Sequence, residues 1–194
     1  AWLKHHVLAF PDQSLSDDDL ERFSLYFGAF SEDPYLPSIE GREHIVELRR
    51  GANETAPLFA DGWHTDWSFG VKPPAATILY GLVIPPKGGN TTFINQHKAL
   101  AEMPAELRQK LEGKMAIHSA KAAYAPDGLY GEREKGSDRA MKITYSKDAY
   151  NVQQHPLILV HPESGEEALF GCFWYIVGIA DVTPEEEVQL LTDL

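Results

Sequence analysis

The sequence predicts a mainly β single domain in which a few helices flank a core of strands, and a jelly roll is one architecture that fits. The first observation is that apolar, β-branched segments come in pairs separated by turns rich in proline and glycine. The second is that only a few stretches repeat apolar residues at helical spacing. The third is that neither an internal repeat nor a domain linker is visible.

The length and composition are those of a globular protein. The 194 residues are 43% hydrophobic, which is enough for one sizeable core or for most of a larger domain. The longest nearly apolar run, residues 75–86, is too short to cross a bilayer, and residues 2–10 lack the shape of a signal peptide. The single cysteine, Cys172, is typical of a reducing compartment. We expect a cytoplasmic protein with Cys172 buried.

The net charge narrows the classes of partner. A formal charge of -12 repels nucleic acid and anionic lipid, so we expect neither nucleic acid nor membrane as a partner. Residues 108–147 are locally basic, with nine Lys or Arg against five Asp or Glu. This stretch is either a solvated insertion of mixed charge or a lid that attracts an anionic substrate.

The first predicted helix lies within residues 14–30. Ser16 is a suitable N-cap, acidic residues fill the first turn, and apolar residues recur on one face. The following stretch is broken by prolines and glycines, with a short strand predicted at 45–50 before a loop that ends at Gly62.

A strand hairpin and two helices are predicted in the middle of the chain. Residues 76–85 and 91–95 are apolar and β-branched, and the proline and glycine residues between them indicate a turn. Residues 97–114 read as two helical pieces, the second starting around Pro104.

The last third of the chain predicts a second hairpin and a final helix. Residues 119–150 are loop-rich, and residues 155–170 form two strands around a Pro-Glu-Ser-Gly turn. Thr183, Pro184 and Glu186 fit the N-cap, first-turn proline and capping-box glutamate of a helix.

The stretch GWHTDWSFG, residues 62–70, holds the candidate metal ligands. In an extended strand, residues two apart point to the same side, so His64 and Asp66 could offer a nitrogen and an oxygen to one ion. Non-haem iron oxygenases use two histidines and one carboxylate in this way. The tripeptide alone is weak evidence, because a similar His-Pro-Glu occurs at 161–163, and a polar strand end is the alternative.

Four motifs together are more specific than this tripeptide. In order and with similar spacing, WHTDWSF, PPAATILYG, PPKGGNTTF and HPLILVHPESGEEALF resemble the taurine dioxygenase and 2,4-dichlorophenoxyacetate dioxygenase family. These are Fe(II)- and 2-oxoglutarate-dependent oxygenases, which also consume O2. The resemblance extends from about Leu3 to the final helix. It implies a double-stranded β-helix core, a form of jelly roll, with His64 and Asp66 as the first two iron ligands.

The resemblance also implies two further site residues. Thr91 matches a threonine that helps to hold a carboxylate of 2-oxoglutarate, although strand propensity would also explain it. Tyr175 falls where taurine dioxygenases keep an aromatic residue against the substrate, and it could equally belong to a buried core strand.

The other histidines have simpler interpretations. His155 and His161 match the structural HP…HP pattern of the family, His118 lies in a strand or loop, and His97 sits at the entrance of a helix. In a metal enzyme of another jelly-roll type, His118 or His155 would instead be a metal ligand.

The sequence departs from the family at the C-terminal side. The third ligand, a histidine, and the arginine that binds 2-oxoglutarate are both expected beyond Leu194. Both ends look cut, so we expect a single partial dioxygenase domain, 1–194, that lacks the C-terminal part of the core and is inactive alone. At the positions of the histidine and tyrosine that bind sulfonate in taurine enzymes stand Asp33 and Leu36, which disfavours taurine.

The function expected from this resemblance is hydroxylation of a small organic substrate, coupled to decarboxylation of 2-oxoglutarate to succinate. Whether the substrate is anionic, and whether the protein forms a homo-oligomer, are left open. The alternative is a non-catalytic jelly-roll module that binds a ligand or a partner and keeps a relic metal site.

Overall fold

The computed structural model describes residues 1–171 and 173–194 and is built mostly of strands and loops. Three strands form an antiparallel sheet in the order β2-β1-β5, and two shorter strands form a hairpin. The strands are β1 (Met115–Ser119), β2 (Val152–Pro156), β3 (Ile158–Val160), β4 (Glu167–Leu169) and β5 (Ile176–Ile179). The predicted hairpin around the Pro-Glu-Ser-Gly turn is therefore confirmed, with Ile158 opposite Leu169.

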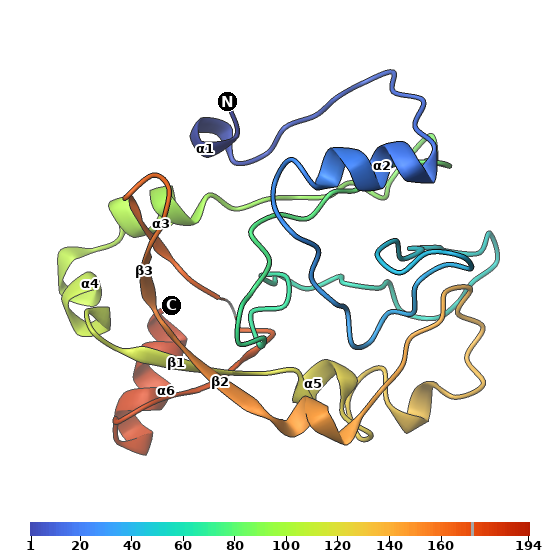
Figure 1. The fold of residues 1–194 in the computed structure, drawn as a ribbon. Coiled ribbons are helices and arrows are strands. Elements are labelled where there is room, and N and C mark those ends of the chain that lie inside the picture. The colour runs from blue at the N-terminus through green and yellow to red at the C-terminus, as the bar shows by residue number, and fades with distance from the viewer. Residues whose placement is uncertain (172) are drawn as a thin grey trace.

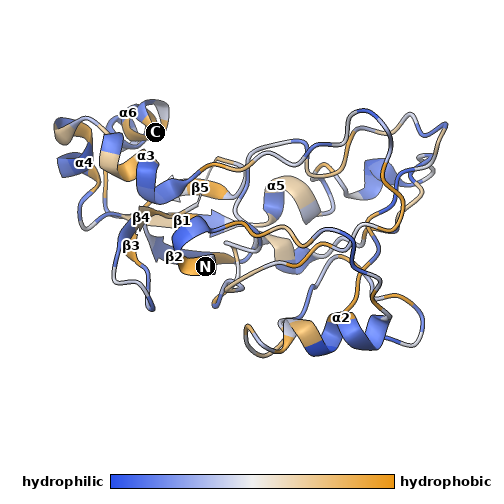
Figure 2. Cartoon of the chain, turned by 90° about the horizontal axis from the view of Figure 1, so that it is seen from above, coloured by the Kyte–Doolittle hydropathy of each residue, from blue (hydrophilic) through white to orange (hydrophobic). Residues whose placement is uncertain are grey.

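The helices are short and lie outside the strands. They are α1 (Trp2–His5), α2 (Asp17–Ser24), α3 (Gln96–Glu102), α4 (Ala105–Leu111), α5 (Lys121–Tyr124) and α6 (Pro184–Asp193), with 3-10 turns η1 (Glu132–Glu134) and η2 (Lys147–Tyr150). Helices α3, α4 and α6 gather with the strands at one end of the molecule, while long loops and α2 make up the other (Figures 1 and 2).

The N-caps predicted from the sequence for α2 and α6 are confirmed. The Ser16 side chain accepts a hydrogen bond from the Asp19 backbone, and the Asp19 side chain bonds back to Ser16, a reciprocal capping box. Thr183 caps α6 as predicted, but the Glu186 side chain forms an ion pair with Lys114 and leaves the cap. The Glu186 carboxylate therefore pairs with Lys114 and does not bond back to the Thr183 backbone as a capping box would require.

Two groups of buried side chains stabilise the fold. One lies between the sheet, α4 and α6 and contains Leu111, Ala116, Leu157, Ile179 and Leu190. The other is rich in aromatic residues and joins α5 to the loops around it, with Tyr35 and Tyr124 stacked at 4.1 Å between ring centroids. The prediction of a solvated insertion at 108–147 is therefore wrong, because β1 and α5 of this stretch belong to the two cores.

The strands predicted at 45–50, 76–85 and 91–95 are not formed. Among the described residues, the first stretch makes only an isolated bridge, Ser38 to Val46, and the other two are loops. A strand needs a partner for its backbone groups, and propensity alone does not supply one. The apolar side chains of these loops are exposed, with Val83 at 92%.

Two predictions from the sequence concern membranes and Cys172. Across residues 1–171 and 173–194, the helices are all too short or too polar to cross a bilayer. The expectation that Cys172 is buried falls on a residue outside the described part of the chain.

Candidate metal centre

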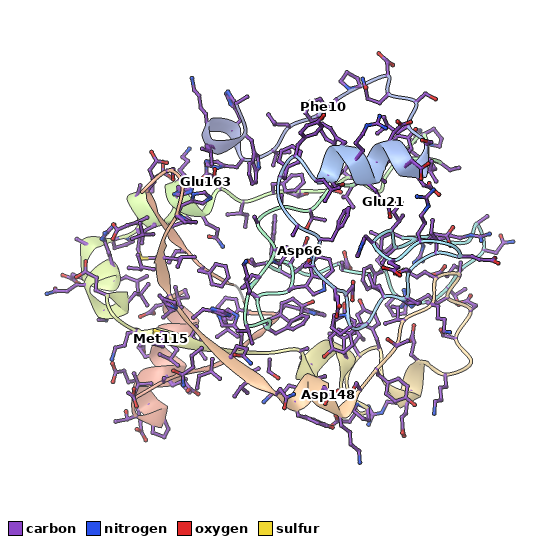
Figure 3. All side chains as sticks on the ribbon, in the orientation of Figure 1. Phe10, Glu21, Asp66, Met115, Asp148 and Glu163 are labelled. Atoms are coloured by element: carbon purple, nitrogen blue, oxygen red, sulfur yellow. The ribbon has the colours of Figure 1, made fainter. Side chains whose placement is uncertain are left out.

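The segment that carries His64 and Asp66 is a loop that runs into two consecutive turns. Backbone hydrogen bonds from Ser68 to Thr65 (3.3 Å) and from Gly70 to Trp67 (2.8 Å) close these turns. The prediction of an extended strand here is therefore wrong. Asp66 lies among loop segments in the middle of the molecule, between α2 and β1 (Figure 3).

The two side chains nevertheless face each other, although the segment is not extended. The His64 Nδ1–H donates to the Gly62 carbonyl at 2.8 Å, which turns Nε2 toward Asp66. His64 Nε2 lies 3.0 Å from Asp66 Oδ1. The second oxygen, Asp66 Oδ2, accepts a hydrogen bond from Thr77 Oγ1 at 2.7 Å.

The charges of this pair favour an ionised carboxylate. The hydrogen bond to Asp66 is the main cause that raises the pKa of His64, although burial opposes it. For Asp66, burial favours the neutral acid, but the hydrogen bonds from His64 and Thr77 outweigh it and lower the pKa. The side chains are 27% and 39% exposed, so a ligand can reach both.

The donor set and its spacing suit a divalent iron ion. Two ligands about 2.1 Å from one ion and at right angles to each other lie about 3.0 Å apart, and the two donor atoms are separated by 3.0 Å. Thr77 holds the carboxylate through Oδ2, the oxygen that does not face His64, as outer hydrogen bonds do at metal sites. Within the described residues, no group of three or more His, Cys, Asp and Glu could hold a metal, so the pair is the whole donor set found.

Tyr175 lies beside this pair and is also part of the aromatic core. Its ring centroid is 6.4 Å from that of His64 with the planes nearly perpendicular, and 4.8 Å from that of Phe69. The side chain is buried. Both interpretations of Tyr175 are therefore compatible with its position.

Thr91 is exposed in the loop that was predicted to be a strand. Its contact with a 2-oxoglutarate carboxylate stays a prediction.

Asp33 is a half-buried residue whose carboxylate lies close enough to Asp66 to feel its charge. Its Oδ1 accepts hydrogen bonds from the amides of Tyr35 (2.8 Å) and Leu36 (2.9 Å), while Oδ2 is buried and has no hydrogen-bond partner among the described residues. Burial raises the pKa of Asp33, and the negative charge of Asp66 adds to this shift. Leu36 is buried in the fold.

The remaining histidines bind protein groups. His161 Nδ1 accepts hydrogen bonds from the amides of its own turn, and His97, which enters α3 as predicted, donates from Nδ1 to the Glu167 carbonyl. The His155 Nε2–H donates to the Gly70 carbonyl, and His118 is fully buried on β1. His155 Nε2 is thus engaged by a backbone carbonyl, whereas His118 Nε2 is buried and has no hydrogen-bond partner among the described residues.

Sequence reasoning missed Thr77 and Ser68. Thr77 bonds to Asp66, which is 11 positions away in the sequence. Ser68 Oγ lies 3.1 Å from His118 Nδ1, and these residues are 50 positions apart. Neither pair has a local spacing that could have revealed it.

Comparison with known proteins identifies the family. Residues 1–194 match the family described as "Taurine catabolism dioxygenase TauD, TfdA family". An alkylsulfatase of Acinetobacter baylyi is 36% identical over 172 residues, which are 87% of this chain and 51% of the relative. An alpha-ketoglutarate-dependent sulfate ester dioxygenase of Pseudomonas putida is 31% identical over 170 residues, 87% of this chain and 54% of the relative. A taurine dioxygenase from Burkholderia xenovorans superposes with a TM-score of 0.68 at 30% identity, over 93% of this chain and 54% of that structure.

The structural match defines the fold class, the jelly roll of the superposed dioxygenases, and the predicted fold class is confirmed. Within that class, the chain belongs to the taurine catabolism dioxygenase TauD, TfdA family. The family implies Fe(II)- and 2-oxoglutarate-dependent chemistry. The chain spans about half the length of these relatives.

Proposed function

We propose that the protein is an Fe(II)- and 2-oxoglutarate-dependent dioxygenase that hydroxylates a small organic substrate and converts 2-oxoglutarate to succinate. The observation that carries the proposal is the 3.0 Å approach of His64 Nε2 to Asp66 Oδ1, with both atoms oriented by further hydrogen bonds. We also propose that residues 1–194 are a single partial domain of a cytoplasmic enzyme.

The residues of this chain have separate roles in the proposal. His64 and Asp66 hold the iron, which when bound supplies the activation of O2. Gly62 keeps the His64 ring in the tautomer that offers Nε2, and Thr77 keeps the carboxylate turned toward the same point. Thr91 donates a hydrogen bond to a carboxylate of 2-oxoglutarate. Tyr175 forms an apolar wall beside His64 and excludes water from the substrate.

For the substrate, sulfate esters are the first class to screen, because two relatives act on sulfate esters by their names. Taurine should be a poor substrate, because Asp33 occupies the position that binds its sulfonate in related enzymes and would repel it when ionised. The non-catalytic alternative is not favoured, since the matched relatives are enzymes.

The test is substrate-dependent decarboxylation of 2-oxoglutarate by the full-length protein. His64→Ala and Asp66→Ala should each abolish succinate formation. The matched control is His97→Ala, which removes a half-buried histidine at the entrance of α3. Activity retained in either ligand variant would refute the proposal.

A further inference from the structure

Two histidines on adjacent strands point from the sheet toward the metal-binding loop. In the antiparallel pair β1–β2, His155 lies opposite Ala116, two residues from His118, so the two imidazoles share one face. Their ring centroids are 5.3 Å apart and the planes are nearly perpendicular. The sheet thus presents two neighbouring imidazoles on one face.

Each of these histidines contacts the turn that follows Asp66. His118 Nδ1 lies 3.1 Å from Ser68 Oγ, within hydrogen-bonding distance, and the His155 Nε2–H donates to the Gly70 carbonyl at 2.9 Å. One contact is therefore two residues beyond Asp66 and the other four residues beyond it. Together they fix two points, Ser68 and Gly70, of the 66–70 turn.

The surroundings of His118 leave its ring no room to move. His118 and Ser68 are both 0% exposed. Gly171, at φ +95°, lies against the ring, because a Cβ there would come within 2.4 Å of His118 Cε1. Phe170 closes a further side of both imidazoles, at 5.7 and 5.3 Å between centroids. A ring enclosed in this way is a rigid support.

We infer that His118 and His155 are positioning residues that hold the 66–70 turn against the sheet and so keep the Asp66 carboxylate beside His64. This inference rests on the proposed role of His64 and Asp66 as iron ligands. The loop has no strand pairing of its own, and its two internal backbone bonds lie within the turns. The two histidine contacts therefore connect it to the most regular part of the fold.

The inference predicts effects on the loop that ordinary core packing would not produce. Ser68→Ala deletes one oxygen atom and removes the contact with His118. His155→Leu removes the donor to Gly70, while His155→Gln keeps an N–H that can reach the same carbonyl. His97→Leu is the control, because it removes a similar bond to a backbone carbonyl far along the chain, that of Glu167.

The first readout is amide hydrogen exchange in the metal-free, full-length protein. The amides of Ser68 and Gly70 should exchange roughly ten-fold faster in Ser68→Ala and in His155→Leu, because the turn opens more often. The amide of Ala180, which bonds to the Met115 carbonyl in the sheet, should keep its wild-type rate. His155→Gln and His97→Leu should leave all three amides within about two-fold of wild type.

The second readout is the Kd for Fe(II) of the same folded variants. Ser68→Ala and His155→Leu should bind iron at least ~10-fold more weakly, as loss of outer support does at other metal sites, and His155→Gln should restore binding. Wild-type exchange of Ser68 and Gly70 in both variants would overturn the inference. If the wild-type protein binds no Fe(II), the proposed function fails, and the exchange data still decide whether the histidines hold the turn.

Discussion

Asp66 is held by a different partner at each carboxylate oxygen. Oδ1 faces the His64 imidazole at 3.0 Å, and Oδ2 accepts the Thr77 hydroxyl at 2.7 Å. If iron takes the place between His64 and Asp66, Thr77 becomes the contact that keeps the carboxylate from rotating. Among the residues that do not bind the metal, loss of Thr77 should therefore weaken iron binding most.

Replacing Thr77 tests this arrangement. Thr77→Val keeps the shape of the side chain but removes the hydroxyl, so we expect the Kd for Fe(II) to rise by roughly 10-fold while the protein stays folded. Isothermal titration under anaerobic conditions measures this change. Thr77→Ser retains the hydroxyl and should bind iron like wild type. Equal iron affinity in Thr77→Val and wild type would remove Thr77 from the site.

The buried His118 should make stability depend on pH. Burial lowers its pKa to about 4, and His155 adds to the shift. In the unfolded chain the pKa is near ~6.5, so between these values the unfolded state binds a proton that the folded state does not. The contribution is present above pH ~6.5 and is lost as the pH falls toward ~4. The free energy of unfolding should drop by about 2 kcal/mol from pH 7 to pH 5 for this group.

Urea unfolding at both pH values checks this prediction. In His118→Gln the drop from pH 7 to pH 5 should be smaller by that amount, whereas His97→Gln, which changes a half-buried histidine, should match wild type. A drop in His118→Gln as large as in wild type would show that another group is responsible.

At the scale of residues, the sequence predicted that His64 and Asp66 lie together but not which residues support them. The i, i+2 argument assumed an extended strand that is not formed, and the two side chains meet because the chain turns at Asp66 and the Gly62 carbonyl orients the His64 ring. Thr77, Ser68 and His155 reach the loop only through the tertiary fold, so their roles follow from coordinates and not from spacing.

At the scale of elements, a buried ion pair joins two loops that are far apart in the sequence. Arg139 and Glu54 have side chains that are only 4% and 2% exposed, and Arg139 Nε also donates to Glu134 at 2.6 Å. Glu54 accepts further bonds from the amides of Gly51 and Ala140. Arg139 in the locally basic stretch is thus engaged within the fold and is not free to attract an anionic substrate.

Removing this arginine should destabilise the contact between the loops. Arg139→Leu leaves Glu134 without its cation and leaves the buried Glu54 with Arg50 alone, so we expect Tm to fall by several degrees. Arg22→Leu is the matched control, because it breaks an exposed pair with Asp19 and should change Tm little. Differential scanning calorimetry compares the two variants. A Tm for Arg139→Leu equal to that of Arg22→Leu would show that the buried pair contributes nothing to stability.

Helices could be predicted better than strands in this chain. A helix end is encoded by neighbouring residues, and the caps at Ser16 and Thr183 are where the local pattern put them. A strand is defined by a partner that can lie far away. Residues 155–170 form a hairpin because they contain both partners, whereas 76–85 and 91–95 are loops whose backbone pairs with no strand among the described residues.

At the scale of the whole molecule, these loops leave large apolar side chains in contact with solvent. The exposed side chains of this apolar loop surface are Leu79, Leu82, Val83, Ile84, Phe93 and Ile94. Isolated exposed apolar residues are common, but a series of them in neighbouring loop segments marks a surface that other groups cover. The chain spans about half the length of its relatives. Under the proposal that residues 1–194 are a partial domain, the rest of that domain is the occupant we expect.

This expectation can be tested with a dye for exposed apolar surface. The 194-residue chain should bind 8-anilinonaphthalene-1-sulfonate, and Val83→Glu should reduce the fluorescence. A protein with the length of the relatives should bind little dye, because the apolar loop surface is shielded. Val188→Glu on α6 is the control, since Val188 is exposed on another element. Equal dye binding by the short and the long protein would contradict the assignment of the occupant.

The central claim is that His64 and Asp66 bind iron together with 2-oxoglutarate. Anaerobic titration of the full-length protein with Fe(II) and 2-oxoglutarate tests it most directly, because a chelated complex absorbs weakly in the visible range. We predict that this charge-transfer band develops in wild type and in His97→Ala and is lost in His64→Ala. Failure of the band to develop in wild type at saturating ligand, or its persistence in His64→Ala, would contradict the claim.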